Sequence, residues 1–326
     1  MIVLRPLSRA YGAAVAMRNA LYDAGSIKAK RLRLPVVSVG NLTAGGAGKT
    51  PLVIALVQAL ARRGYACDVL SRGYGRRTHG VMTVDVRCTA EESGDEPLLI
   101  AQRTGVPVYV GESRFAAGLQ AERDASSAGE ERIHILDDGM QHRQLTRQFE
   151  IVMLAGTEGG DHLLPEGRLR EPLRNISRAD AVVVASGAAV PEAARGKARW
   201  RVFRIVDVPR TIAHPVAFCG IARPQRFFDD LRSAGVAPAY SFAFRDHQRF
   251  TEREIRQLLQ WRDMYRAGGF ITTEKDRVRL GRFVEVLKPL EVVRLDLQLE
   301  DEDRAVAAIL SAIAARRSGP GDRKRA

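Results

Sequence analysis

The sequence predicts an α/β protein with a mostly parallel sheet covered by helices on both faces, joined to a second, smaller α/β unit. From residue 35 onward, short β-rich segments alternate with helical segments, which is typical of parallel sheets. A glycine-rich segment, GNLTAGGAGKT at residues 40–50, separates the first β-rich segment from the first helical one. The length of 326 residues suits two domains that each bury a core of their own.

The expected elements follow one another regularly along the chain. The first strand, residues 35–39, comes before the glycine-rich segment, and the first long helix of the sheet domain follows it at 51–64. Further strands of the same sheet are expected at 65–70, 106–110, 132–136, 149–154 and 179–186. Helical stretches of this length between strands allow the crossovers that parallel pairing needs.

The second unit is marked by its flanking segments. Two alternating, strand-like segments at 201–208 and 292–299 enclose it, and we expect them to pair as a two-stranded hinge. The unit begins with a strand, a glycine turn and a helix within 214–235. The predicted domains are therefore 1–203, which includes an N-terminal helix, and 204–318, followed by a disordered basic tail at 319–326.

Composition limits the class of protein. A hydrophobic share of 45% and a charged share of 27% are typical of a soluble globular protein. The net charge of +13 favours partners that carry phosphates, such as nucleic acid or an anionic membrane face. The three cysteines form no CxxC pair, so we expect no zinc site or disulfide framework and a reducing cytosol. We also expect neither a membrane-spanning helix nor a cleaved signal.

The N-terminal segment has a helical period of apolar residues with basic residues close by. Its members are Leu7, Tyr11, Ala14, Met17 and Leu21, beside Arg5, Arg9 and Arg18, with Lys28, Lys30, Arg31 and Arg33 following. Such a helix either docks reversibly on an anionic leaflet or packs on its own domain with a solvated basic face. The two interpretations are compatible.

The glycine-rich segment has the composition of a loop that holds phosphates. A strand, a glycine-rich loop ending in Gly-Lys-Thr and a helix together predict a P-loop NTPase-like domain. Lys49 is expected to reach the terminal phosphates, and the Thr50 hydroxyl is expected to hold Mg²⁺. The strict pattern has glycine where Thr43 stands, and a flexible turn is the simpler alternative. The predicted phosphate-binding residues are Thr43, Ala44, Gly45, Gly46, Ala47, Gly48, Lys49 and Thr50.

An acidic partner for the metal is expected at the end of another strand. The segment 133–136 leads directly into Asp137 and Asp138, although paired aspartates after a strand are also ordinary loop formers. The segment ITTEKD at 271–276 lacks the spacing of a guanine-reading motif. ATP is therefore favoured over GTP.

Seven segments in one order resemble the tetraacyldisaccharide 4'-kinase family, the lipid A 4'-kinases of Gram-negative bacteria. They are VSVGNLTAGGAGKTPLV, LSRGYGR, SGDEPLLIA, ILDDGMQH, LLPEGRLREPL, DHQRFTEREI and TTEKDRVRL, spread from about residue 36 to 280. Thr43 matches the family's own variant of the loop. The resemblance implies ATP- and Mg²⁺-dependent phosphorylation of the 4'-hydroxyl of a tetraacylated glucosamine disaccharide 1-phosphate.

The resemblance also implies a location and partners. The family acts in lipid A, hence lipopolysaccharide, biosynthesis at the cytoplasmic face of the inner membrane, as a peripheral protein. The substrate is the lipid A precursor, and the membrane surface is anionic. Both would account for the positive charge without nucleic acid, and no protein partner is implied.

Individual roles follow from the matching motifs. Asp95 resembles the family's general base, and His247, from the second domain, resembles its orienting partner. The resemblance places Asp137 and Asp138 as the acidic pair and makes Glu171 a candidate Mg²⁺ carboxylate. The residues assigned to the substrate as a group are Arg72, Tyr74, Arg114, Gln141, His142 and Arg170. A base and its partner on different domains imply that the domains close around ATP and the sugar.

Simpler interpretations exist for the two central residues. Asp95 lies two residues before Pro97 and fits the N-cap of a helix. His247 precedes a capping box, Thr251 to Glu254, and fits a solvated loop position. Without the resemblance, a P-loop ATPase switch or assembly factor that binds a macromolecular partner, or a kinase of a soluble small molecule, would also fit the chain.

Overall fold

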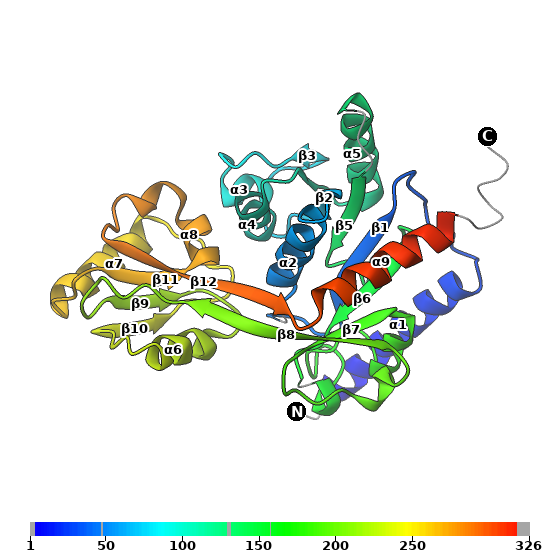
Figure 1. The fold of residues 1–326 in the computed structure, drawn as a ribbon. Coiled ribbons are helices and arrows are strands. Elements are labelled where there is room, and N and C mark those ends of the chain that lie inside the picture. Colours follow the sequence, from blue (N-terminus) through cyan, green and yellow to red (C-terminus); the bar gives the residue numbers. More distant parts are fainter. Residues whose placement is uncertain (1–3, 47, 129–131, 157, 318–326) are drawn as a thin grey trace.

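The computed structural model describes residues 4–46, 48–128, 132–156 and 158–317. Within these residues a sheet of twelve strands runs through the molecule in the order β10-β9-β11-β12-β8-β7-β6-β1-β5-β2-β4-β3. Figure 1 shows two units beside each other, joined by the long strands β8 and β12. The predicted fold class, a parallel-sheet domain and a smaller α/β unit joined by a two-stranded hinge, is confirmed.

The first unit contains the expected parallel sheet. Strand β1 (Val36–Asn41) lies between β5 (Arg132–Asp137) and β6 (Phe149–Met153), and every residue of β1 is buried. Burial on both faces explains its continuous apolar composition. The other elements of this unit are α2 (Lys49–Ala61), β2 (Ala66–Ser71), β3 (Met82–Thr83), α3 (Ala90–Ser93), α4 (Asp95–Thr104), β4 (Val108–Val110), α5 (Arg114–Ala128), η1 (Glu158–Gly160), η2 (Leu173–Arg178), β7 (Ala181–Ala185) and η3 (Glu192–Ala194).

The second unit has three parallel strands of its own. They are β9 (Val216–Cys219), β10 (Tyr240–Ala243) and β11 (Phe270–Thr273). Its helices are α6 (Pro224–Ser233), α7 (Glu252–Met264), α8 (Glu274–Leu280) and the short η4 (Gly281–Val284). The core is aromatic, since the Phe218 ring meets those of Phe244, Phe250 and Phe270 edge-on at centroid distances of 5.8–6.3 Å.

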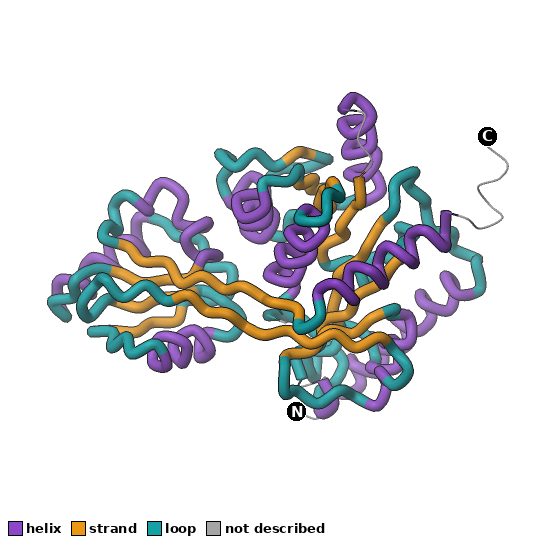
Figure 2. The backbone as a smooth tube through the Cα atoms, viewed as in Figure 1, coloured by secondary structure: helices purple, strands orange, loops and turns teal. Residues whose placement is uncertain are grey.

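The hinge is a pair of long antiparallel strands. Strand β8 (Ala198–Asp207) pairs with β12 (Leu290–Leu299) from Asp207 opposite Arg294 to Val202 opposite Leu299. Figure 2 shows both strands passing from one unit into the other. The strands begin two or three residues before the predicted segments; the early residues of β8 pair with β7, and those of β12 with β11.

The predicted second domain, 204–318, is wrong at its carboxyl end. Helix α9 (Glu302–Arg317) follows β12 and packs back on the first unit, where Ala305, Val306 and Ile309 join the core formed around β1 and α2. Figure 1 shows α9 lying along the first unit. The sequence of this segment does not reveal which core it joins. The division at residue 203 stays a prediction, and the predicted tail 319–326 lies outside the described residues.

Helix α1 (Leu4–Asp23) carries its polar contacts on the inner face. Ser8 and Asn19 are buried, and the Ser8 hydroxyl donates to the Leu163 carbonyl at 3.0 Å. By contrast, Leu7 and Met17 are 55% and 66% exposed. The predicted apolar stripe is therefore mainly an outer surface and not a packing face. No helix in the described ranges is both long and apolar enough to span a bilayer.

A buried charged cluster ties neighbouring strands of the first unit together. His134 in β5 and Asp68 in β2 are both fully buried, with His134 Nδ1 2.7 Å from Asp68 Oδ1. Glu122 of α5 lies on the other side of the ring, 3.9 Å from Nε2. Burial alone would lower the pKa of His134, but the charge and hydrogen bond of Asp68 outweigh it and raise that pKa to about 9.

We predict that this cluster makes stability fall as the medium becomes alkaline. Because the folded pKa of His134 is raised, its contribution is complete below the unfolded value near 6.5 and is lost as the pH rises through about 9. The free energy of unfolding, measured with urea, should fall by about 1–3 kcal/mol between pH 7 and pH 10 through this group. In His134→Gln this decrease in the free energy of unfolding between pH 7 and pH 10 should be absent. In the control His79→Gln, at an exposed position, the decrease should remain. If the free energy of unfolding depended on pH equally in His134→Gln and the wild type, His134 would not be its source.

Candidate active site

The glycine-rich loop lies between β1 and α2, at the carboxyl edge of the sheet. Gly45, Gly46 and Gly48 have positive φ angles of 81°, 23° and 92°, which other residues adopt at a cost. Helix α2 begins directly after the loop, and Thr50 in its first turn is 2% exposed. The helix N-terminus and the loop amides together form a place for an anion. Ala47 lies outside the described residues.

Thr43 has a structural reason to replace glycine. It is fully buried, and the side-chain amide of Asn41 donates to its carbonyl at 2.7 Å and to its hydroxyl at 3.2 Å. The next residue, Ala44, donates its amide to the Arg168 carbonyl at 2.7 Å. The hydroxyl therefore anchors the start of the loop to the end of β1, a contact that glycine cannot make.

Lys49 lies in a network with Asp138 and Arg170. Its ammonium nitrogen is 2.9 Å from Asn41 Oδ1 and 3.3 Å from Asp138 Oδ1. The Arg170 guanidinium binds both oxygens of the same carboxylate, at 2.8 and 2.9 Å. Burial acts to raise the pKa of Asp138, but Lys49 and Arg170 outweigh it and hold that pKa below its usual range. Three predicted site residues are thus in direct contact.

Asp137 has a different environment although it is the neighbouring residue. It is 2% exposed, Oδ2 accepts a hydrogen bond from the Ser71 hydroxyl at 3.1 Å, and Oδ1 has no partner. Burial, followed by the charges of Glu96 and Asp138, raises the pKa of Asp137 to about 7. A buried carboxylate oxygen without a partner is a site where a cation would be favourable.

The donors at this edge fit Mg²⁺, which prefers oxygen ligands from one or two carboxylates together with phosphates. Asp137 ends β5, which pairs with β1 so that Val39 lies opposite Asp137. The carboxylate and the glycine-rich loop that leads into Lys49 and Thr50 of α2 therefore share one edge of the sheet. Within the described residues, no three His, Cys, Asp or Glu side chains form a group that would hold a metal by themselves.

The structure brings Asp95 and His247 together across the two units. His247 Nδ1 is 3.0 Å from Asp95 Oδ2, and Asp95 is 5% exposed. Helix α4 begins at Asp95 with Gly94 as its N-cap, so the N-cap interpretation of Asp95 does not hold. His247 has a left-handed φ of 56° and its ring meets the Tyr74 ring edge-on at 5.3 Å. The loop histidine is therefore held in place and is not simply solvated.

The neighbours of Asp95 stabilise the negative charge of its carboxylate. Burial acts to raise the pKa of Asp95, but the hydrogen bond from His247 and the charge of Arg279 outweigh it. The pKa of Asp95 consequently lies below its usual range, and the carboxylate is ionised at neutral pH. The same hydrogen bond to Asp95 raises the pKa of His247.

Residues that sequence reasoning missed come mainly from helix α8 and its partner α4. Arg279 Nε is 2.7 Å from Asp95 Oδ2, Lys275 pairs with Glu96, and Arg103 binds Glu274 at 2.7 Å. Lys275 and Arg279 are four residues apart and therefore share one helical face. That spacing, inside the motif TTEKDRVRL, was the available signal. The two units thus meet through a row of ion pairs beside Asp95.

Three further residues predicted to bind the substrate, Arg114, Gln141 and His142, differ in their burial and contacts. Arg114 is 8% exposed, and burial followed by the charge of Arg72 lowers its pKa. Burial, followed by the charges of Arg114, Arg147 and Arg72, lowers the pKa of His142 to about 4. The Gln141 amide donates to the Asn41 carbonyl at 3.0 Å, which places it beside the glycine-rich loop.

Glu171, also predicted as a Mg²⁺ carboxylate, is placed differently from the other predicted metal ligands. It is fully buried, and Oε2 accepts from Asn19 at 3.0 Å and from Arg178 at 2.8 Å. Asn175 donates to the same oxygen at 2.6 Å, and Arg18 lies 3.5 Å from Oε1. A carboxylate occupied by these donors serves to anchor α1, which argues against the predicted magnesium role.

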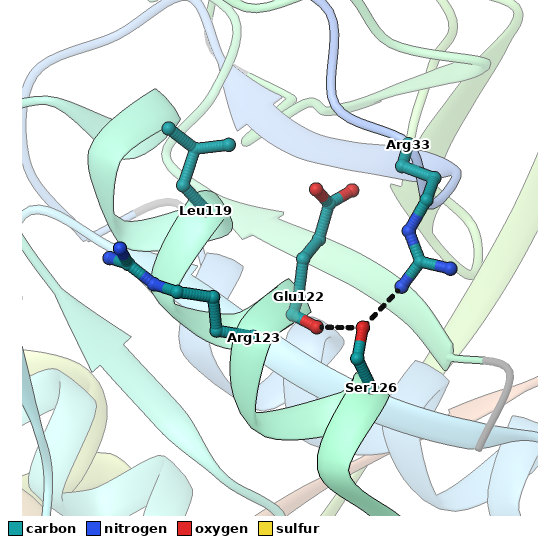
Figure 3. Close-up of a pocket in the computed structure, with 5 residues that line it drawn as sticks. All are labelled: Arg33, Leu119, Glu122, Arg123 and Ser126. Carbon is teal, nitrogen blue, oxygen red and sulfur yellow. Dashed lines mark hydrogen bonds between the residues drawn. The ribbon is translucent and has the colours of Figure 1, made fainter. Parts of the chain in front are cut away.

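A surface cavity of about 500 Å³ lies elsewhere, on α5. Figure 3 shows its lining, in which Arg33 donates to the Ser126 hydroxyl at 2.9 Å. The five lining residues are Arg33, Leu119, Glu122, Arg123 and Ser126. None of them is a predicted site residue, so the cavity is not the site described here.

Comparison with known proteins identifies the family. The model of the family described as tetraacyldisaccharide-1-P 4'-kinase matches residues 1–314. A tetraacyldisaccharide 4'-kinase of Koribacter versatilis is 43% identical over 95% of this chain and 98% of that relative. One from Neisseria meningitidis serogroup A is 36% identical over 93% of each chain.

A solved structure agrees with the fold. The crystal structure of LpxK from Aquifex aeolicus in complex with ATP matches 94% of this chain and 98% of that one. The TM-score is 0.77 and the sequences are 32% identical. The matches extend over both units and the hinge. The chain therefore belongs to the tetraacyldisaccharide-1-P 4'-kinase family.

Proposed function

We propose that this protein transfers the γ-phosphoryl group of ATP to the 4'-hydroxyl of a tetraacyldisaccharide 1-phosphate, a step of lipid A biosynthesis. Family membership supports the reaction. The observation that carries the mechanism is the pairing of Asp95 with His247 across the two units, next to the edge of the sheet that holds Lys49. A phosphate-binding loop and an oriented carboxylate are what transfer to an alcohol requires.

The glycine-rich loop and Lys49 would hold the phosphates of ATP. Lys49 already lies between Asn41 and Asp138, so its ammonium group is held near the loop before nucleotide binds. Thr50, Asp137 and Asp138 are the residues that we propose to hold Mg²⁺, which when bound neutralises charge on the β- and γ-phosphates. Arg170 binds both oxygens of Asp138 and, together with Lys49, keeps it ionised.

Asp95 would accept the proton of the attacking hydroxyl. The hydroxyl oxygen forms a bond to the γ-phosphorus, the bond from that phosphorus to the β-γ bridging oxygen breaks, and ADP leaves with the electron pair. The low pKa of Asp95 makes it a weak base. In a loose transition state the hydroxyl is acidified mainly as the new bond forms, so orientation of the carboxylate matters more than its basicity. His247 supplies that orientation through Oδ2.

The exposed face of α1 supports a peripheral position on the cytoplasmic face of the inner membrane. Leu7, Met17 and Leu21 are exposed there, and Arg5 and Arg9 lie on the same helix. Since the polar contacts of α1 face inward, an apolar surface is left for acyl chains, and the net charge of +13 suits anionic lipid. The acceptor, an acylated disaccharide 1-phosphate, has the same combination of charge and apolar chains.

We predict that the purified protein phosphorylates the disaccharide 1-phosphate lipid in detergent micelles with ATP and Mg²⁺. Mass spectrometry should detect one added phosphoryl group at the 4' position, formed in step with ADP. A Lys49→Met variant should make no product, because the cation beside the phosphates is lost. ADP formation by the wild type without phosphorylated lipid, stimulated by a macromolecule, would contradict the kinase and favour an ATPase switch.

We also predict that Asp95→Asn and His247→Ala lower kcat with little change in ATP binding. Removing the proton acceptor should cost about 100- to 10,000-fold in kcat, and removing its orienting partner should cost less. The dissociation constant of a non-hydrolysable ATP analogue, measured by calorimetry, should change by no more than about two-fold, since Lys49 and the loop are intact. Asp263→Asn, at an exposed position on α7, is the control. Equal losses in ATP affinity and kcat would show that the two residues are only structural.

A further inference from the structure

We propose that Arg279 is a positioning residue of the phosphoryl transfer, acting through Asp95. It fixes the carboxylate by Oδ2 and leaves Oδ1 to receive the acceptor hydroxyl. The inference rests on the proposed function, because it takes Asp95 to be the proton acceptor. Arg279 belongs to helix α8 of the second unit and is not among the predicted site residues.

Arg279 is oriented by its own unit before it meets Asp95. Its side chain is 5% exposed, and Nη1 donates to Asp276 Oδ1 at 3.1 Å and to the Gly220 carbonyl. Asp276 is fully buried and accepts from the Gly220 amide at 3.0 Å and from the Thr273 hydroxyl at 2.7 Å. The guanidinium is therefore locked by α8 and the turn after β9, with its other nitrogens aimed at the first unit.

The contacts to Asp95 distinguish its two oxygens. Arg279 Nε lies 2.7 Å from Oδ2, Nη2 contacts the same atom, and His247 Nδ1 is 3.0 Å from it. Oδ1 accepts from the Glu96 amide at 3.0 Å. A carboxylate oxygen has two lone pairs, so Oδ2 is fully used and Oδ1 retains one. The acceptor hydroxyl would donate to Oδ1.

Asp95 determines the state of the histidine, and Arg279 is arranged consistently with it. An ionised carboxylate only accepts hydrogen bonds, so Nδ1, 3.0 Å from Oδ2, must carry the proton between them. Arg279 Nη2 lies 3.4 Å from His247 Nδ1, and the two donors converge on the same carboxylate oxygen. The positive charge of Arg279 opposes a second proton on the ring, while Asp95 favours it. His247 is thus held as a donor toward Oδ2 in either protonation state.

The sign of the pH effect follows from the groups around Asp95. From the second unit, Arg279, Lys275, Asp276 and His247 act on Asp95, and Glu96 follows it on α4. Asp246 acts on His247 and Arg279. The cations prevail and lower the pKa of Asp95. Removal of Arg279 takes away a direct ion pair, so that pKa should rise and the base should be protonated at a higher pH than in the wild type.

The test compares Arg279→Met, Arg279→Lys and the wild type with ATP and the disaccharide lipid in micelles from pH 3 to pH 9. In the wild type the acidic limb of the pH profile of kcat that Asp95 sets lies at or below the low end of this range, because the pKa of Asp95 is below its usual value. Arg279→Met should lower kcat by about 10- to 100-fold and raise that limb by about one unit or more, into the measured range. Arg279→Lys keeps the positive charge but loses the planar guanidinium that binds Asp95 Oδ2 through two nitrogens. Its kcat should therefore fall, while the acidic limb of its pH profile stays close to that of the wild type. Arg282→Met, whose side chain is 79% exposed, is the matched control.

A second measurement does not depend on the lipid reaction. In ¹⁵N NMR of the histidine rings, the pKa of His247 should be higher in Arg279→Met than in the wild type, because the opposing cation is gone. A wild type that makes no phosphorylated lipid would refute the proposed function itself. With an active wild type, unchanged kcat in Arg279→Met, or a lower kcat with the acidic limb and the His247 pKa unmoved, would overturn the role of Arg279. If Arg279→Met does not fold, wild-type kcat in Arg279→Lys would overturn it.

Discussion

The contact between Asp95 of the first unit and the cations of the second is the interaction on which the site depends. His247 and Arg279 both bind Asp95 Oδ2, and each comes from a chain segment more than 150 residues away. Strands β8 and β12 join the two units, and ion pairs between α4 and α8 connect them beside Asp95. Both partners of Asp95 Oδ2 come from the second unit, so the orientation of the carboxylate depends on this contact between the units.

The neighbouring aspartates at the end of β5 show how position sets charge. Asp138 is paired with Lys49 and Arg170 and stays ionised, whereas Asp137 is buried beside other carboxylates and its pKa rises to about 7. Asp138 pairs with Lys49, whereas Asp137 has an oxygen without a partner. A divalent cation would relieve the unfavourable burial of Asp137, so metal binding and the ionisation of this residue should be linked.

Local patterns predicted the parallel strands and the phosphate-binding loop, because these depend on residues close in the chain. The pairing of Asp95 with His247 came only from the family resemblance, since no local signal joins such distant positions. Residues 302–317 fell within the predicted second domain because nothing in their sequence specifies which core they join. The surroundings of Glu171 were hidden for a similar reason: four donors from α1 and the η2 region contact it, which argues against the predicted magnesium role, and a motif does not reveal neighbours in space.

The most direct measurement is a crystal structure with a non-hydrolysable ATP analogue, Mg²⁺ and the disaccharide lipid. The account predicts the triphosphate on the loop that ends at Lys49 and Thr50. It also predicts the acceptor 4'-oxygen about 2.6–3.2 Å from Asp95 Oδ1, with Oδ2 still bound to His247 and Arg279. A triphosphate bound away from this loop, or a 4'-oxygen beside some other carboxylate, would contradict it.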